Sequence, residues 1–398
     1  MKPLASAALA VVTSALLAAT PVVLAPATAG ATPAPSRSGL DTRQWTAPVP
    51  APGVPAATVA LDPRLSLPDA GRAVRQAYGT IDQHGRPAVA TSAVFLPHGA
   101  PPPGGWPVVA WAHGTVGLGD DCAPSTQPRT ARDAEYLGHW LRQGYAVVAS
   151  DYAGLGTPGL HSYLNGGTAA RGIVDAVVAA RADRLPLAPR WALVGQSQGA
   201  GAALNTAVRA TALGAPAGLD YRGVVATGAP ANIEHLFQWA GPGFPPVALP
   251  RALNLYALYI LAGFRELHPE LGLDAMLTPR GRELVDAAEH LCNADMLEAV
   301  GDFQISQALT RPLKDIPDVY GRLNRYMGTP TVGYDRPVFL GQGLLDRDVP
   351  APSALSLAAE MTVNRQPLEL HVYPDRDHSG TVYAATPDAT GFLARIMA

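Results

Sequence analysis

The sequence has few residues that can cross-link or carry charge. Only two of its 398 residues are cysteines, Cys122 and Cys292, which excludes a disulfide-rich scaffold and a cysteine-based zinc site but allows one bridge. Lysine occurs only at Lys2 and Lys314, charged residues make up 15% of the chain, and the net charge is -3. No basic run is present, so binding to nucleic acid is not expected.

Long apolar segments are absent after the N-terminal region. Lys2 precedes an apolar stretch over residues 4–24, and the sequence A-T-A follows at 27–29. This pattern predicts a secretory signal peptide over residues 1–29. A membrane anchor is the alternative, because the stretch approaches the length that spans a bilayer. We therefore expect a soluble, secreted protein in a compartment where a disulfide can persist.

Apolar residues are plentiful, at 48% of the chain, so a disordered protein is excluded. The 40 glycines and 39 prolines follow no G-X-Y period, which excludes collagen. Residues 30–68 hold eight prolines and few large apolar side chains. This segment predicts a linker or a loosely wrapped arm.

From residue 69 onward, short apolar strands alternate with helical segments. An antiparallel hairpin is predicted over 73–82 and 87–96. Further strands are predicted at 107–112, 145–150, 190–195, 221–227, 337–341 and 368–373, and helices at 131–143, 168–182, 199–212, 353–362 and 387–397. Continuous apolar strands joined by helices indicate an α/β fold with a mostly parallel sheet covered on both faces.

Residues 231–330 interrupt this alternation with helical pieces and little strand signal. They are predicted to form a cap or lid over the carboxyl edge of the sheet, where ligands bind in open α/β folds. The core then comprises residues 69–230 and 331–398. Within the cap, Leu255, Leu258, Tyr259 and Ala262 fall on one helical face. This face predicts either a wall for an acyl chain or the ordinary buried side of a cap helix.

The motif G-Q-S-Q-G at 195–199 lies between a predicted apolar strand and a predicted helix. That context makes a common five-residue pattern specific, because a sharp strand-to-helix turn pushes the serine side chain out of the sheet. Ser197 is therefore the candidate nucleophile.

A serine hydroxyl needs a base, and the base needs an orienting carboxylate. In this arrangement the chain order is serine, acid, histidine. Asp346 follows the strand at 337–341 and His378 follows the last strand, so we predict Asp346 as the acid and His378 as the base. Asp348 is the alternative acid.

The oxyanion that forms during acyl transfer needs two backbone N–H donors. Gln198, directly after the serine, is predicted to supply one. The loop after the strand at 107–112 should supply the other, from Thr115 or alternatively from Gly114. His113 begins this loop and is interpreted as a structural histidine.

Several motifs together resemble the secretory lipase family, whose best-known members are the lipase A type of Candida yeasts. They are D-Y-A-G-L-G-T at 151–157, D-C-A-P-S at 121–125, the serine motif and the helical insertion. The resemblance implies an α/β-hydrolase fold with a helical cap and hydrolysis of carboxylic esters, often acylglycerols, without a cofactor. It carries the catalytic roles to Ser197, Asp346 and His378. No His, Cys and Asp cluster has metal-ligand spacing in the sequence, so no metal is expected.

The resemblance also places a bridge between a Cys-Ala-Pro loop and the cap. Cys122 lies in such a loop, and Cys292 lies at the end of a predicted cap helix that starts after Thr278. In an α/β-hydrolase both segments lie above the carboxyl edge of the sheet, so we predict a Cys122–Cys292 disulfide. Two buried free thiols are the alternative.

The expected partner is an ester or lipid substrate, with transient contact to lipid surfaces and no obligate protein partner. A serine peptidase or an acyltransferase on the same fold is the first alternative function. A non-catalytic binding protein on a hydrolase scaffold is the second. The complete and correctly ordered triad disfavours the second, because a degenerate copy usually loses one member.

Overall fold

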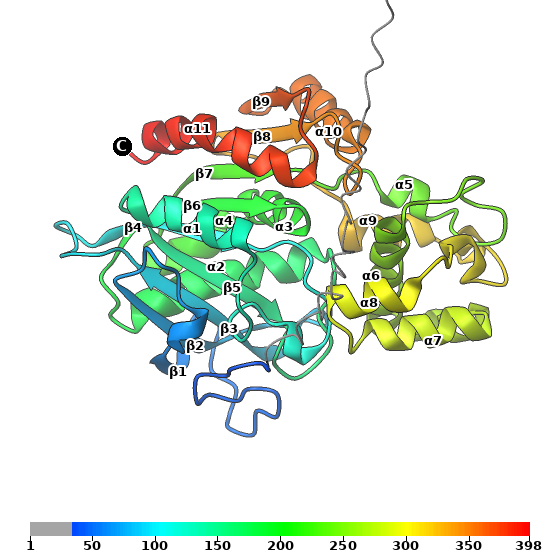
Figure 1. Cartoon of the computed structure of the whole chain (residues 1–398), viewed down its shortest axis with the longest axis horizontal. Helices are drawn as coiled ribbons and strands as arrows, with labels where there is room; N and C mark the ends of the chain where they lie inside the picture. The colour runs from blue at the N-terminus through cyan, green and yellow to red at the C-terminus, as the bar shows by residue number, and fades with distance from the viewer. Residues whose placement is uncertain (1–33) are drawn as a thin grey trace, which may run out of the picture. The chain divides into compact units, whose positions relative to one another are not determined.

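A nine-stranded sheet runs through the described part of the chain, residues 34–398 (Figure 1). In this computed structural model the strand order is β1-β2-β3-β5-β4-β6-β7-β8-β9. The strands are β1 (Pro55–Ala60), β2 (Arg72–Ile81), β3 (Pro87–Leu96), β4 (Trp106–Ala112), β5 (Ala146–Ala153), β6 (Leu187–Gln196), β7 (Asp220–Thr227), β8 (Val338–Gly343) and β9 (Leu368–Tyr373). The predicted signal peptide lies outside the described residues.

Strands β4 to β9 pair in parallel, whereas β1, β2 and β3 form an antiparallel edge that joins β5. The predicted fold class, α/β with a mostly parallel sheet, is confirmed. The predicted hairpin is present as β2 and β3.

Helices cover both faces of this sheet. The helices are α1 (Ala131–Arg142), α2 (Gly166–Ala182), α3 (Gln198–Ala207), α4 (Ala210–Gly214), α5 (Glu234–Phe237), α6 (Arg251–Leu267), α7 (Pro279–Ala288), α8 (Asn293–Val300), α9 (Val319–Met327), α10 (Ala351–Val363) and α11 (His378–Ile396). Along β4, Val108 and Ala110 pack with α2, α3 and α10, whereas Val109 and Trp111 pack with α1 and α11. Burial on both faces explains why the parallel strands are continuous apolar runs.

The Pro-rich arm contributes a strand that the sequence did not predict. β1 lies within residues 30–68 and pairs antiparallel with β2 at the edge of the sheet. An edge strand can begin at proline, because only one of its sides has to form the ladder. Pro55 opens β1 in this way.

The last helix begins at His378 and not near residue 387, which corrects the predicted boundary. The Asp377 side chain accepts a hydrogen bond from the Gly380 N–H at 2.7 Å and so caps the helix. Pro387, interpreted as the first residue of the helix, lies inside it. Consequently His378 projects from the first turn of α11 and not from the preceding loop. The helix predicted over 199–212 is likewise divided into α3 and α4.

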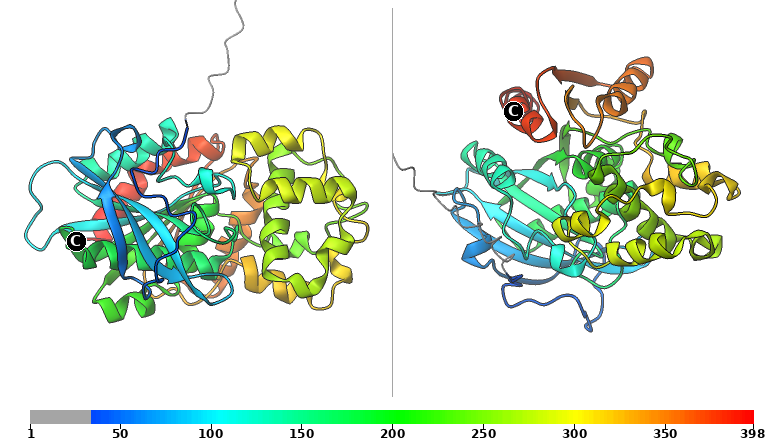
Figure 2. Two further views of the ribbon diagram at one scale, coloured as in Figure 1. Left: turned by 90° about the horizontal axis from the view of Figure 1, so that it is seen from below. Right: turned by 45° about the vertical axis from the view of Figure 1, so that its right-hand side comes forward.

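Between β7 and β8 the chain forms helices α5 to α9, which have a hydrophobic core of their own. Figures 1 and 2 show these helices, coloured green to yellow, gathered to one side of the sheet. The predicted apolar face of α6, which includes Leu255, Leu258 and Ala262, is fully buried in this core. Among the described residues, no helix is both long enough and apolar enough to cross a bilayer.

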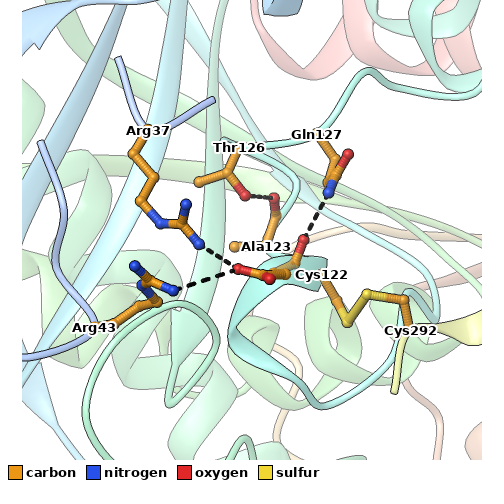
Figure 3. Close-up of a disulfide and its surroundings, with 8 residues drawn as sticks. Arg37, Arg43, Cys122, Ala123, Thr126, Gln127 and Cys292 are labelled. Atoms are coloured by element: carbon orange, nitrogen blue, oxygen red, sulfur yellow. Dashed lines mark hydrogen bonds and ion pairs between the residues drawn. A yellow bond between two sulfur atoms is a disulfide. The ribbon is translucent and has the colours of Figure 1, made fainter. Parts of the chain in front are cut away.

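A disulfide joins the cap to the loop that follows β4 (Figure 3). Cys122 and Cys292 have their Cα atoms 5.3 Å apart and are bonded, as predicted. Beside the bridge, the Asn293 N–H donates to the Val116 carbonyl at 2.8 Å. The location of Cys292 needs correction, since it occupies the residue directly before α8 and does not end α7.

The arm is fastened to the same loop (Figure 3). Arg37 and Arg43 both form ion pairs with Asp121, the neighbour of Cys122. The Gln127 side chain donates to the Asp121 carbonyl at 2.9 Å. The cap, the loop after β4 and the arm therefore meet at this one short segment.

We expect reduction of the disulfide to destabilise the protein. The bridge spans 170 residues of sequence, and closing such a loop stabilises by about 4–5 kcal/mol on the chain-entropy model. For a chain of this size that corresponds to a melting temperature lower by about 5 °C after reduction. Calorimetry with and without reductant measures this effect, and a Cys122→Ser/Cys292→Ser variant should be insensitive to reductant. Two thiols titrating in the denatured, unreduced protein would contradict the bridge.

Candidate active site

Ser197 lies on the sharp turn between β6 and α3. Its backbone has φ 58° and ψ -128°, a conformation that is costly for a residue with a Cβ. The turn is possible because its flanking residues are glycines. A Cβ on Gly199 would overlap the Ala112 carbonyl, and one on Gly195 would overlap the Gly199 carbonyl. The Ser197 N–H donates to the Thr227 carbonyl at 3.0 Å, which ties the turn to β7.

Asp346 follows β8 and His378 follows β9, and the two side chains form a short hydrogen bond. His378 Nδ1 lies 2.6 Å from Asp346 Oδ2. The other oxygen, Asp346 Oδ1, accepts from the backbone N–H groups of Asp348 at 3.0 Å and Val349 at 2.8 Å. The carboxylate is thereby fixed in orientation. Because a carboxylate only accepts hydrogen bonds, Nδ1 of the imidazole carries the proton and Nε2 carries the in-plane lone pair.

Asp348, the alternative acid, directs its carboxylate toward the cap. Its Oδ1 lies 3.4 Å from the Tyr256 hydroxyl on α6. Its part in holding Asp346 comes from its backbone N–H and not from its side chain.

Gly228, directly after β7, leaves the space that the imidazole occupies. A Cβ at this position would lie 2.9 Å from Cε1 and 3.0 Å from Nδ1 of His378. Gly228 also has φ 59°. The sequence analysis missed this residue, because a single glycine after a strand carries no catalytic signal.

Nε2 of His378 contacts a residue that the sequence analysis did not single out. It lies 2.8 Å from Nε2 of Gln196, which immediately precedes the serine. The other end of the same amide, Gln196 Oε1, lies 3.1 Å from the Arg132 guanidinium. Within residues 34–398 no hydrogen bond joins the Ser197 hydroxyl to His378.

The predicted oxyanion donors lie on the two expected segments. Within the described residues, the backbone N–H groups of Thr115 and Gln198 donate no hydrogen bond to another protein group, so both remain available to a ligand. The Thr115 hydroxyl lies 2.7 Å from the Tyr163 hydroxyl. His113 is buried and its Nδ1 lies 2.7 Å from the Gly114 carbonyl, an arrangement that fits a structural histidine.

Tyrosines from the cap and the core meet next to this loop. Tyr163 has its ring centroid 5.4 Å from that of Tyr259 and 6.5 Å from that of Tyr256, both on α6. Tyr163 thus connects α6 to Thr115, and Tyr256 connects α6 to Asp348. Ser197 is only 7% exposed and His378 only 9% exposed. The candidate nucleophile and base are therefore both largely shielded from solvent in this conformation.

A second histidine, His161, lies buried beside the elbow, which is the sharp turn that carries Ser197. The Gln198 side chain reaches its Nε2 at 2.9 Å, and its ring stacks on Tyr152 with centroids 5.5 Å apart. Burial, together with the nearby His113, lowers the pKa of His161 to about 3. The side chain is therefore neutral near neutral pH and accepts a hydrogen bond from Gln198.

This buried histidine predicts acid sensitivity. Between pH 6.5 and about 3 the unfolded chain binds a proton at His161 that the folded chain does not, so the free energy of unfolding falls as the pH falls. Asp175, whose pKa burial raises to about 6, acts in the opposite direction between pH 3.8 and 6. His161→Gln keeps an acceptor for Gln198 but cannot bind this proton. We therefore expect its free energy of unfolding to fall by about 2–3 kcal/mol less than that of the wild type when the pH is lowered from 6.5 to 4.5.

Denaturant titrations over this pH range measure the difference. His98→Gln, at an exposed histidine, is the matched control and should follow the wild type. Parallel pH profiles for the wild type and His161→Gln would contradict the assignment.

The fold brings together three groups that could hold a cation, although their sequence spacing is not that of a metal motif. Asp346, Asp348 and His378 each offer one ligand atom, and these atoms lie within 4.8 Å of one another. Nδ1 of His378 and both oxygens of Asp346 already take part in hydrogen bonds. We therefore expect full activity in EDTA. Loss of turnover on chelation, restored by a divalent ion, would show that these residues hold a metal.

The parallel sheet, the serine elbow after β6 and the helical cap between β7 and β8 define the chain as an α/β-hydrolase. The chain belongs to the secretory lipase family, whose family model matches residues 124–324. It is therefore an enzyme that hydrolyses esters, of the serine hydrolase type. The matched segment contains Ser197 and most of the cap. A second family model, that of the prolyl oligopeptidase family, matches residues 287–395, the segment that contains Asp346 and His378.

Solved structures with the same fold include lipases and esterases. Candida antarctica lipase A in its closed state has 19% sequence identity and a TM-score of 0.70, with 87% of this chain and 82% of that chain covered. The rice cell wall degrading esterase LipA from Xanthomonas oryzae, in a ligand-bound form, has 21% identity and a TM-score of 0.68, with 87% and 99% covered. No curated protein sequence matches the chain.

Proposed function

We propose that the protein hydrolyses carboxylic esters, acylglycerols among them, through an acyl-enzyme on Ser197, with His378 as base and Asp346 as the acid that orients it. The hydrogen bond of 2.6 Å between His378 Nδ1 and Asp346 Oδ2 carries the proposal. It leaves Nε2 of the imidazole as the acceptor that a serine nucleophile requires.

The reaction follows from these positions. The Ser197 oxygen attacks the ester carbonyl carbon while His378 Nε2 takes the hydroxyl proton, and the N–H groups of Thr115 and Gln198 stabilise the resulting oxyanion. Collapse expels the alcohol, which takes the proton from His378. Water, deprotonated by the same nitrogen, then hydrolyses the acyl-enzyme and regenerates Ser197. Asp346 holds the ring and stabilises its charged form throughout.

The preference for an apolar acyl group rests on the family and on the surroundings of the site. Tyr256 and Tyr259 of α6 pack against Tyr163, whose hydroxyl contacts Thr115, a predicted oxyanion donor. Aromatic side chains at this loop favour an acyl chain over a charged substrate group.

Turnover of p-nitrophenyl esters with acyl chains from 2 to 16 carbons tests the proposal. We expect ester hydrolysis with an optimum above the shortest chain. Matched p-nitroanilides, including a prolyl anilide, test the peptidase alternative that the second family match raises. Faster cleavage of an anilide than of the matched ester would overturn the esterase assignment, as would the absence of turnover with every ester.

We further propose that the enzyme is exported, loses residues 1–29 and acts outside the cell, where it touches lipid surfaces only during turnover. The Cys122–Cys292 bridge supports export, because disulfides persist in oxidising compartments. The net charge of -3 supports the expectation that nucleic acid is not a partner. We expect no obligate protein partner.

A further inference from the structure

We propose that Gln196 is a positioning residue that holds His378 away from Ser197 in the resting enzyme, and that Arg132 fixes the Gln196 amide in the orientation that does so. The inference rests on the proposed function, because it concerns the same base and the same nucleophile. It adds a step before acylation, in which the Gln196 amide releases the lone pair of His378.

The orientation of the Gln196 amide follows from its two neighbours. A guanidinium only donates hydrogen bonds, so the atom 3.1 Å from Arg132 must be the amide oxygen. The amide nitrogen then faces His378 Nε2 at 2.8 Å. Since Nδ1 of that ring donates to Asp346, Nε2 is the acceptor. The contact is therefore an N–H donated by Gln196 to the catalytic lone pair.

Arg132 is itself held in place from two directions. Its Nε lies 2.9 Å from Asp133 Oδ1, next to it in the first turn of α1. Its Nη1 lies 3.3 Å from the hydroxyl of Ser379, next to His378 in the first turn of α11. A flip of the Gln196 amide would place N–H groups against this guanidinium, so the observed orientation is strongly preferred.

A neutral imidazole has one lone pair in its plane, so Gln196 and the Ser197 hydroxyl compete for the same acceptor. Attack requires His378 to accept from Ser197. After proton transfer Nε2 becomes a donor, and the N–H of Gln196 would then oppose it. The contact therefore stabilises only the resting state, and the amide must move before the serine is activated.

The amide also lies where a substrate could displace it. A Cβ on Gly114, in the loop of the predicted oxyanion donors, would lie 2.8 Å from Gln196 Oε1 and 3.6 Å from Ser197 Cβ. Gln196 is 2% exposed, so water does not readily substitute for these contacts. An ester entering beside Gly114 and Ser197 would push the amide aside and free His378.

Two substitutions of opposite chemistry test the inference through the rate at which a fluorophosphonate labels Ser197. Gln196→Met removes the competing donor at similar size, and we expect labelling about 3- to 10-fold faster, as for one neutral hydrogen bond. Gln196→Glu places a carboxylate beside the imidazole, which retains the proton on Nε2, and we expect labelling at least 10-fold slower. A purely structural role would slow both variants, and unchanged or slower labelling in Gln196→Met overturns the inference.

Arg132→Met leaves Gln196 in place but frees its amide to turn, and should accelerate labelling less than Gln196→Met. Arg142→Met, on the last turn of α1, is the matched control and should not change the rate. Absence of labelling at Ser197 in the wild type would instead refute the proposed function itself, so the two failures are distinguishable.

Imidazole ¹⁵N resonances test the same point without altering Gln196. If Gln196 occupies the lone pair, Ser197→Ala leaves the Nε2 resonance of His378 unchanged. A shift of that resonance in Ser197→Ala would show that the serine already holds the base, and would refute the inference.

Discussion

Replacing Ser197 with alanine should abolish covalent labelling by a fluorophosphonate and lower ester turnover by about four to six orders of magnitude. The variant removes the only atom that attacks the ester in the proposed mechanism. It should fold, because alanine keeps the Cβ that the elbow already accommodates and the Ser197 N–H bond to Thr227 comes from the backbone. Labelling, turnover and the melting temperature of the same preparation measure the three expectations together.

Ser379→Ala is the matched control, since this exposed serine neighbours His378 and, within residues 34–398, its hydroxyl contacts Arg132 and no group assigned to the reaction. It should retain labelling and most of the turnover. Undiminished labelling in Ser197→Ala would move the nucleophile to another residue.

Asp346→Asn should lower turnover by about three to four orders of magnitude, because it changes the tautomer of His378. The oxygen of the new amide would stay with the two backbone N–H groups that now reach Asp346 Oδ1. Its NH₂ group would then face His378 Nδ1. That nitrogen would have to accept, so the proton would move to Nε2 and the imidazole could no longer act as a base.

Asp348→Asn is the matched control at the neighbouring carboxylate. Its backbone N–H still supports Asp346, and within residues 34–398 its carboxylate takes part in a single hydrogen bond, the contact of 3.4 Å with the Tyr256 hydroxyl. We expect turnover within about threefold of the wild type, the scale of one weak hydrogen bond. If Asp348→Asn were the more damaging substitution, the acid would be Asp348 and the reaction class would be unchanged.

Sequence patterns predicted the sheet well because the parallel strands are buried on both faces and therefore appear as continuous apolar runs. Sequence patterns were less reliable for the start of the last helix and for the edge strand β1. Pro387 suggested the start of α11, yet the cap that starts this helix is the Asp377 side chain, and the proline lies inside the helix. β1 was hidden in a Pro-rich arm, because an edge strand needs little apolar sequence.

The residues of the candidate site likewise fall into those that the sequence predicted and those that only the structure revealed. Ser197, Asp346 and His378 are recognisable because each follows a predicted strand in the order that the fold requires. Gly228 and Gln196 have no such signature. Gly228 matters because the imidazole occupies the space next to it, and Gln196 matters because its amide reaches the base. Both depend on side chains that meet only after β6, β7 and α11 have assembled.

The sequence by itself indicated the α/β architecture, the helical insertion, the elbow serine, and the histidine and two alternative acids predicted to serve it, because strand burial and the strand-to-helix turn leave periodic and local patterns in the sequence. Tertiary structure alone decided which carboxylate reaches His378 and which donor occupies the lone pair of the base. Each of these depends on distances of 2–3 Å between side chains from segments far apart in the chain. Such distances are set by packing and leave no periodic pattern in the sequence.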